Sequence, residues 1–470
     1  MTRTRLPAFG AMLVLAGCSI GPDYLRPETA VPPGWSGTAE KNSWPASEWW
    51  QGFHAPALDA LMRQAEHANF DLAAAVARVR QAEATVEIAG APLLPSLQGT
   101  GSAARSRNVS RSVGSKGSSH GFNNFAAGLS AAYEIDFWGR NADAADAANA
   151  LAEASRFDRE TVALTVQADL AGTYFGILGL SDRLALARSN LANAEQTLEA
   201  FKARAQAGTA SGLDIAQQES VVAEQRAAIP PLEQLWRQSG TALAVLTGQM
   251  PEAVTPPAGT LAGTQPPAVG AGIPSGLLTR RPDVQAAEAR LIAANAEVKA
   301  AEAARFPTPT LTAQGGAGST VLSNLITPGG VFYTAAAGLT QPIFEGGALE
   351  GNVELQQTRS DELAQNYRKT VVSAFKDVED ALTAIQQSAR QAEAQANAAL
   401  TAQRAYDIAQ ERLFSGTIDI LTVLNTQRTL FQAQDLLIQA KLAQFQAAID
   451  LFRALGGGWQ ADAEVTAPGV

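Results

Sequence analysis

The stretch that decides the fold is Phe125-Ala-Ala-Gly-Leu-Ser-Ala-Ala-Tyr-Glu-Ile-Asp-Phe137, which leads into a helical pattern over residues 141–207. Its odd positions hold Phe, Ala, Leu, Ala, Tyr, Ile and Phe, whereas its even positions include Ser, Glu and Asp. A period of two places these two sets on opposite faces of a β-strand. One face is apolar enough for lipid, and the other suits a watery lumen.

This order of elements occurs twice in the chain. Pro95-Ser-Leu97 corresponds to Pro309-Thr-Leu311, and Gly208-Thr209 corresponds to Gly416-Thr417. Neither half looks able to bury itself alone, so the fold must come from assembling copies of the repeat. Four strands are expected, over about 95–106, 122–137, 308–318 and 331–344, with loop tips at 105–121 and 319–330. The first tip, with its scattered Arg and Ser residues, is interpreted as a solvated loop, and contact with anionic lipid headgroups is the alternative.

Two long helices are expected, over 141–207 and 348–415, because neither range contains a proline. Each would be about 100 Å long at 1.5 Å per residue. In the first helix an apolar residue recurs every seven positions, which predicts coiled-coil packing; these residues are Leu170, Ile177, Leu184, Leu191 and Leu198. A plain coiled-coil dimer would leave the strands unexplained. Glycine ends each long helix, Ser211 or Asp419 caps the return helix, and Ile229-Pro-Pro231 is expected to break the first return.

The amino terminus indicates export. Arg3 and Arg5 precede a short apolar stretch that ends in Leu15-Ala-Gly-Cys18, and this arrangement resembles the lipobox of bacterial lipoproteins. We therefore expect cleavage before Cys18 and a covalent lipid on it, with no other cofactor. The expected organisation is a signal peptide (1–17), a lipidated segment (18–55), repeat 1 (56–250), a Pro/Gly-rich linker (251–275), repeat 2 (276–456) and a tail (457–470).

Composition excludes several classes of protein. A net charge of −10 argues against binding to nucleic acid. The three histidines (His54, His67 and His120) are not spaced for a metal site or paired with a plausible nucleophile, so neither a metal site nor an enzyme is expected. After the signal no run of 18 apolar residues occurs, so membrane insertion is expected through β-structure. Because four strands cannot close a barrel, an oligomer is required, although strand counting does not choose its size.

Several motifs together resemble the outer membrane factor family, of the TolC and OprM kind, in its NodT-type lipoprotein branch. They are Cys18-Ser-Ile-Gly-Pro-Asp-Tyr-Leu-Arg-Pro27, Trp49-Trp50, Asp136-Phe-Trp-Gly139 and Arg280-Arg-Pro-Asp-Val284. The resemblance covers nearly the whole mature chain. It implies a mainly α protein with a β-barrel portion: a trimeric 12-stranded outer-membrane β-barrel, four strands per chain, continued by a long periplasmic α-helical barrel.

The resemblance also implies a function and partners. The chain would be the outer-membrane channel of a tripartite efflux system, a passive exit duct for drugs or other small molecules. Its partners would be two further copies in a homotrimer, a periplasmic membrane-fusion adaptor, an inner-membrane pump of the RND class, and outer-membrane lipid. The alternative is a periplasmic, lipid-anchored coiled-coil adaptor or scaffold, which would not need four amphipathic strands.

In such channels the helix reversals at the periplasmic tip form the gate. By position, Asp214 and Leu421 are expected to point into the constriction, with Asp419 and Thr422 beside it. Three-fold symmetry would make Asp214 a ring of carboxylates that favours cations, and Leu421 an apolar collar that resists wetting. The alternative is that Asp214 is a helix-start carboxylate stabilised by the helix dipole, and the two roles are compatible.

Overall fold

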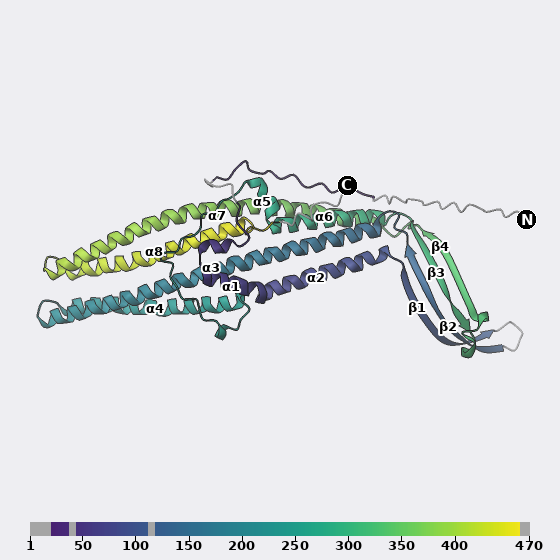
Figure 1. Cartoon of the computed structure of the whole chain (residues 1–470), viewed down its shortest axis with the longest axis horizontal. Helices are drawn as coiled ribbons and strands as arrows, with labels where there is room; N and C mark the ends of the chain where they lie inside the picture. The colour runs from purple at the N-terminus through teal and green to yellow at the C-terminus, as the bar shows by residue number, and fades with distance from the viewer. Residues whose placement is uncertain (1–19, 37–43, 111–117, 461–470) are drawn as a thin grey trace, which may run out of the picture. The chain divides into compact units, whose positions relative to one another are not determined.

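The computed structural model describes residues 20–36, 44–110 and 118–460, and Figure 1 labels its main elements. They are α1 (Pro56–Ala68), α2 (Phe70–Gly90), β1 (Ser96–Ser110), β2 (Ser118–Glu134), α3 (Arg140–Gln206), α4 (Gly212–Leu246), α5 (Pro274–Arg280), α6 (Pro282–Ala303), β3 (Thr308–Ser319), β4 (Val331–Thr340), α7 (Ala348–Phe414) and α8 (Ile420–Ala454), with short 3₁₀ helices between some of them.

The chain divides into two compact units, and the division does not follow the two repeats. Unit 1 comprises Met1–Pro27, Val79–Ala154 and Ala287–Tyr367, and unit 2 comprises the remaining segments. Each unit therefore takes residues from both repeats. Neither unit is therefore built from one repeat alone.

Unit 1 contains a four-stranded antiparallel sheet in the order β1-β2-β3-β4. Leu129 pairs with Gly99 on one side and Gly315 on the other, while Ser130 pairs with Gln98 and Gln314. Directly paired residues share a face, so the apolar and polar sets stay separate across the sheet. The register thus confirms the predicted alternation. The apolar face carries Leu97, Phe125, Leu129, Leu311, Val331, Tyr333 and Leu339.

The predicted loop at 105–121 is wrong for most of its residues. β1 continues to Ser110 and β2 begins at Ser118, so that Arg105 pairs with Asn123 and Ser110 with Ser118. Main-chain hydrogen bonds extend an antiparallel hairpin whatever its side chains are, which is why a polar composition misled the prediction. Other strand bounds also differ from the prediction; for example, β4 ends at Thr340 rather than at 344.

Unit 2 contains α4, α8 and the parts of α3 and α7 that follow Ala154 and Tyr367. These helices form two hairpins, α3 with α4 and α7 with α8, which lie side by side (Figure 1). The apolar residues that recur every seven positions in α3 are confirmed as part of the core. Leu170 and Ile177 are completely buried among aromatic residues of the N-terminal segment and α8. Nearer the reversals a second cluster draws on all four helices, with Phe201, Val222, Leu413 and Leu424 among its members.

The predicted break at Pro230-Pro231 is wrong, because α4 runs unbroken from Gly212 to Leu246 with both prolines inside it. Each proline removes one helical hydrogen bond. Packing opposes this loss: Leu232 is buried against Leu184 and Ala187 of α3, and Ile229 packs on the same cluster. The tertiary contacts of this helix therefore override the local rule.

Among the described residues, α3 is the one helix that is long enough and, over 18 residues, apolar enough to cross a membrane. Half of that 18-residue stretch is buried inside the structure, and the core helix of a protein can have the same length and composition. The stretch is therefore weak support for a membrane-spanning helix. The sequence interpretation that no helix spans the membrane stays a prediction.

Candidate functional site

The two long helices end in the same way. Gly208 and Gly416 follow them with φ of +74° and +72°, a backbone conformation that glycine adopts without strain. The next residue in each case donates its N–H to a carbonyl of the last turn: Thr209 to Arg204 and Thr417 to Arg412, both at 2.9 Å. These bonds satisfy helix-terminal carbonyls and turn the chain sharply.

Each return helix begins with a hydroxyl and a carboxylate three residues apart, and the order of the two groups differs between the helices. At the start of α4, Ser211 is the N-cap and Asp214 closes a capping box, with its carboxylate accepting from the Ser211 N–H at 2.7 Å. At the start of α8 the carboxylate comes first: Asp419 is the N-cap and accepts from the Thr422 N–H at 3.0 Å and from the Thr422 hydroxyl at 2.6 Å. Both predicted caps are confirmed.

These bonds set the electrostatics of the reversals. The hydroxyl and N–H of Thr422 stabilise the ionised form of Asp419 and hold the pKa of that carboxyl below its usual value. Asp419 is therefore a negative charge at the first turn of α8, where the helix dipole favours an anion.

The predicted gate residues fall on both reversals. Asp214 lies on the first, in contact with Ser211, so its expected role as a helix-start carboxylate holds. Asp419, Thr422 and Leu421 lie on the second, where Leu421 is 51% exposed. Leu213, the repeat counterpart of Leu421, is 66% exposed and was not predicted as a gate residue. Exposed leucines at two helix starts are apolar surface that a single chain leaves uncovered.

Three contacts that sequence reasoning missed join the two hairpins within one chain. Arg204 of α3 donates to the Leu413 carbonyl at the end of α7, at 3.2 Å. Further along, Arg428 of α8 pairs with Glu224 of α4 at 3.1 Å. Arg183 of α3 forms a two-bond pair with Asp435 of α8, at 2.6 and 3.1 Å. The hairpins are thus connected by polar contacts at three levels.

Two buried glutamines lie behind the reversals. Gln218 donates to the Ala194 carbonyl at 2.8 Å and Gln427 lies 3.4 Å from the Tyr406 hydroxyl, and both side chains are fully buried. The side-chain carbonyl oxygen of each glutamine is buried without a hydrogen-bond partner. A polar group inside a coiled coil fixes the register of the helices at a cost in stability.

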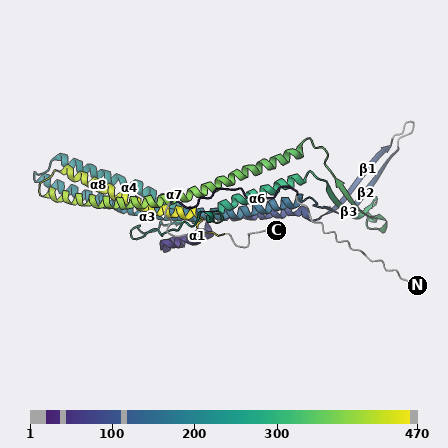
Figure 2. The same ribbon diagram turned by 90° about the horizontal axis from the view of Figure 1, so that it is seen from above.

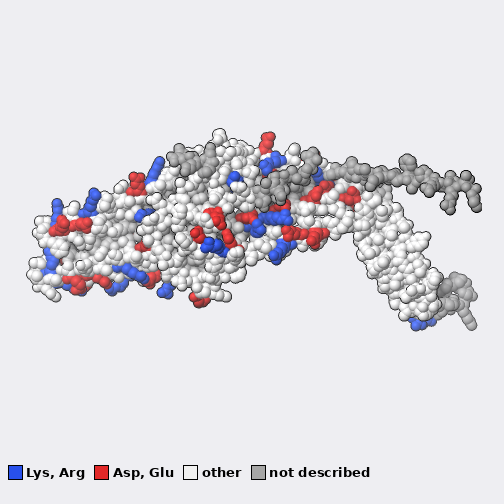
Figure 3. Space-filling model, in the orientation of Figure 1, with Lys and Arg blue, Asp and Glu red and all other residues white. Residues whose placement is uncertain are grey.

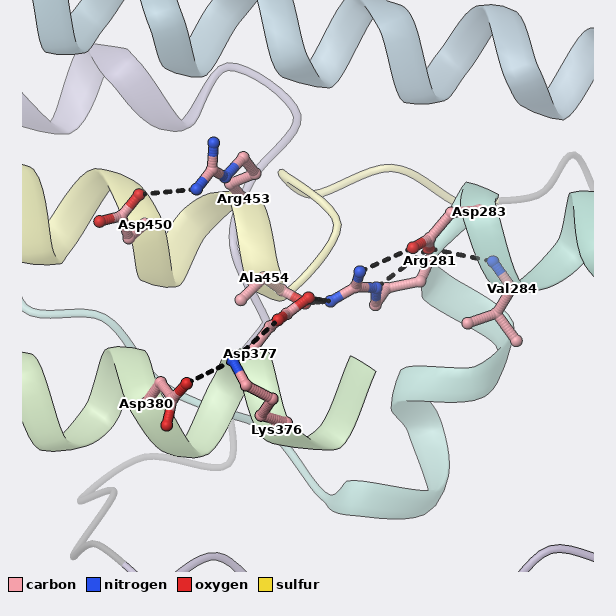
Figure 4. Close-up of polar contacts among 9 residues, drawn as sticks. All are labelled: Arg281, Asp283, Val284, Lys376, Asp377, Asp380, Asp450, Arg453 and Ala454. Atoms are coloured by element: carbon pink, nitrogen blue, oxygen red, sulfur yellow. Dashed lines mark hydrogen bonds and ion pairs between the residues drawn. The ribbon is translucent and has the colours of Figure 1, made fainter. Parts of the chain in front are cut away.

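The Arg280-Arg-Pro-Asp stretch connects three helices through Arg281 (Figure 4). The Arg281 guanidinium bonds to both oxygens of Asp283, at 3.0 and 2.7 Å, to Asp377 of α7 at 3.1 Å, and to the Ala454 carbonyl at 3.2 Å. Its side chain is only 11% exposed. This cluster ties the start of α6 to α7 and to the end of α8.

Comparison with known proteins identifies what these hairpins and this sheet belong to. The family model described as outer membrane efflux protein matches residues 61–249 and 273–457. The chain is 41% identical, over 98% of both sequences, to the pyoverdine export outer membrane protein OpmQ of Pseudomonas aeruginosa. It is 32% identical to the toluene efflux pump outer membrane protein TtgC of Pseudomonas putida, over 98% of this chain and 96% of the relative.

Solved structures agree with this result. The outer-membrane channel OprN superposes with a TM-score of 0.88 at 26% identity, over 94% of this chain and 100% of that one. The open state of the Neisseria gonorrhoeae MtrE outer membrane channel gives 0.83 at 28% identity, over 94% and 98%. These matches are to channels along almost the whole length, which rules out the adaptor or scaffold alternative. The chain belongs to the outer membrane efflux protein family and is the outer-membrane component of an efflux system.

Proposed function

We propose that three copies of this chain form a continuous exit duct, closed at rest where the helix reversals meet. The observation that carries this proposal is the open sheet of unit 1: within the described part of the chain, β1 pairs only with β2, and β4 only with β3. In lipid, an unpaired strand edge leaves backbone groups unsatisfied at several kcal/mol each. Joining β1 of one copy to β4 of the next removes every edge, and three copies give twelve strands.

Mass and conductance of the purified protein test this proposal. We expect native mass spectrometry in detergent to give three times the chain mass, and planar bilayers to show a small resting conductance. A monomer, or a trimer that never conducts, would contradict the proposed duct.

The gate is proposed at Leu421 and Asp214. Both lie in the first turn of a return helix, next to a glycine reversal, and Leu421 is exposed in the single chain. Three leucines converging at a threefold axis would form an apolar constriction, and three carboxylates would favour cations. Asp419 and Thr422 are proposed to support this constriction through their mutual hydrogen bonds.

Lipid attachment is proposed at Cys18, which lies outside the described residues. Support comes from the residues that follow it. Arg26 forms a two-bond ion pair with Glu288 of α6, Asp23 lies 3.5 Å from Lys299, and Asn295 donates to the Pro22 carbonyl. The segment from Pro22 to Arg26, which begins four residues after Cys18, is therefore held against α6 within unit 1, the unit that contains the sheet.

Labelling with radioactive palmitate tests the attachment. The parent should incorporate label, and Cys18→Ser should not. Equal labelling of both would overturn the proposal. A Cys18→Ser variant with a cleavable signal should still reach the outer membrane, because the sheet is itself an anchor.

A periplasmic adaptor and an inner-membrane pump of the RND class are proposed as partners, and no catalytic activity is proposed for this chain.

Two relatives at 41–42% identity are named for pyoverdine export, whereas those named for toluene or solvent efflux are at 32%. This difference favours a siderophore as cargo. Deletion of the gene should then make a siderophore-producing host retain its siderophore. Unchanged secretion of the siderophore would contradict this cargo assignment.

A further inference from the structure

The outer end of the β1–β2 hairpin extends beyond the rest of the sheet. β2 pairs with β3 only from Glu134 back to Phe125, which faces Ser319. In the part of the chain that the structure describes, the β1–β2 pairs from Ala104↔Asn124 to Ser110↔Ser118 have no counterpart on β3 (Figure 2). This end of the hairpin thus projects past its neighbours.

Two arginines in this projecting part fall on the apolar face of the sheet. Leu97 and Ala103 lie on that face, and the alternation along β1 continues it to Arg105 and Arg107. Both arginine side chains are exposed. At about 3.4 Å per residue, they begin roughly 7 Å beyond Ala103 along the strand. The same face therefore changes from apolar to basic within one strand.

The sequence of this hairpin is basic and contains no acidic residue. No Asp or Glu occurs between Pro95 and Tyr133, in a chain whose net charge is −10. On the face shown in Figure 3 the sheet is white except for blue atoms at this end. At the opposite end of the sheet charges of both signs occur, and Arg140 lies 2.7 Å from Glu134.

Large apolar side chains lie at the same end of the sheet. The connection between β3 and β4 follows Ser319, and its Leu322 and Ile326 are 62% and 92% exposed. Arginines beside exposed aliphatic residues are the combination that binds at a membrane surface, where cations meet headgroups and apolar side chains enter the acyl boundary.

We propose that Arg105 and Arg107, here called the arginine pair, bind the phosphate-bearing headgroups of lipids in the outer leaflet. The inference rests on the proposed function, which puts the apolar face of the sheet against lipid. A headgroup is favoured over a solute in the lumen because the arginine pair shares its face with Leu97 and Leu129, opposite to Ser130. The guanidinium fork matches phosphate oxygens in two-bond geometry.

The test compares full-length trimers that differ only in two arginines. The parent, Arg105→Gln/Arg107→Gln and a control, Arg63→Gln/Arg237→Gln, are titrated with lipid A and with its dephosphorylated form in mixed micelles. The control removes the same charge from exposed positions on α1 and α4. Native mass spectrometry counts the lipids retained.

For lipid A we expect affinity to fall about fivefold for each arginine of the pair that is removed, with the control equal to the parent. All three proteins should bind the dephosphorylated lipid equally. Equal retention of lipid A by the parent and the Arg105→Gln/Arg107→Gln variant would overturn the inference. So would a changed ion selectivity of that variant with unchanged lipid retention, because the arginines would then face the lumen. Conductance of the parent trimer tests the proposed duct separately, so the two proposals can fail independently.

Discussion

Arg204 of α3 donates a hydrogen bond to the main-chain oxygen of Leu413, the penultimate residue of α7. A cation at a helix C-terminus satisfies an orphan carbonyl and interacts favourably with the helix dipole. Because the two residues belong to different hairpins, the bond also connects the two reversals. Any motion that separates the hairpins of one chain at the tip has to break it.

Replacing Arg204 with glutamine should therefore loosen the tip. In planar bilayers we expect the resting channel to have a larger conductance or to open more often. The unfolding temperature should change little, since the contact is partly exposed. Lys202→Gln is the matched control, because Lys202 pairs with Glu199 of its own helix. If both variants conduct alike, the Arg204 bond has no part in closure.

Leu421→Ala should enlarge the resting conductance, because three smaller side chains would widen and wet an apolar constriction. Leu213→Ala makes the same change at the repeat counterpart. Single-channel recording of both variants shows which reversal forms the narrowest point. A conductance equal to the parent in both would place the constriction elsewhere.

Asp214→Asn should weaken cation preference while keeping an oxygen that can accept the Ser211 bonds. The effect should be largest at low salt, where screening of the carboxylate ring is least. Reversal potentials in a salt gradient measure it. Asp214→Ala serves as a comparison that removes the capping box as well, and a selectivity unchanged in both would exclude a carboxylate ring here.

Leu129→Arg should impair assembly, since an arginine facing lipid at the midplane costs about 2–4 kcal/mol. Ser130→Arg, one residue along on the other face, should assemble and alter conductance. Trimer yield after membrane extraction checks both. Similar yields would show that the apolar face does not meet lipid.

Arg281→Gln should lower the unfolding temperature markedly. Removing one member of a buried charged cluster costs about 3–5 kcal/mol, and the 42% exposure of Asp377 places the expected cost at the lower end. Arg281→Lys should recover part of it, because lysine keeps the charge but not the fork. Arg453→Gln, which removes an exposed pair within α8, should have little effect. Calorimetry that ranks Arg281→Gln with Arg453→Gln would contradict this role.

The long helices were predictable almost to the residue, because neither the range of α3 nor that of α7 contains a proline, and the seven-residue repeat from Leu170 to Leu198 supports α3 in addition. The strand faces were predictable for a similar reason, since alternation requires only a period. Strand register was not predictable from the repeat. Leu97 pairs with Ala131, whereas its counterpart Leu311 pairs with Ala337, which aligns with Ala127 in sequence. The shift is an even number of residues, so every side chain keeps its face.

Contacts between helices that are distant in the sequence could not be predicted from it. Arg204 could be aligned with Arg412, but nothing local indicates that Arg204 reaches another hairpin. The continuity of α4 was missed for the opposite reason, because a local rule about proline was applied where the contacts of Leu232 and Ile229 decide the outcome.

The prolines inside α4 make the two hairpins mechanically unequal. α4 and α8 have the same length, 35 residues, but only α4 contains prolines and so lacks two of its internal hydrogen bonds. A helix bends most easily at such a point. In a closed ring of three copies, compliant and stiff hairpins would then alternate, so we expect a load applied at the tips to bend α4 before it bends α8.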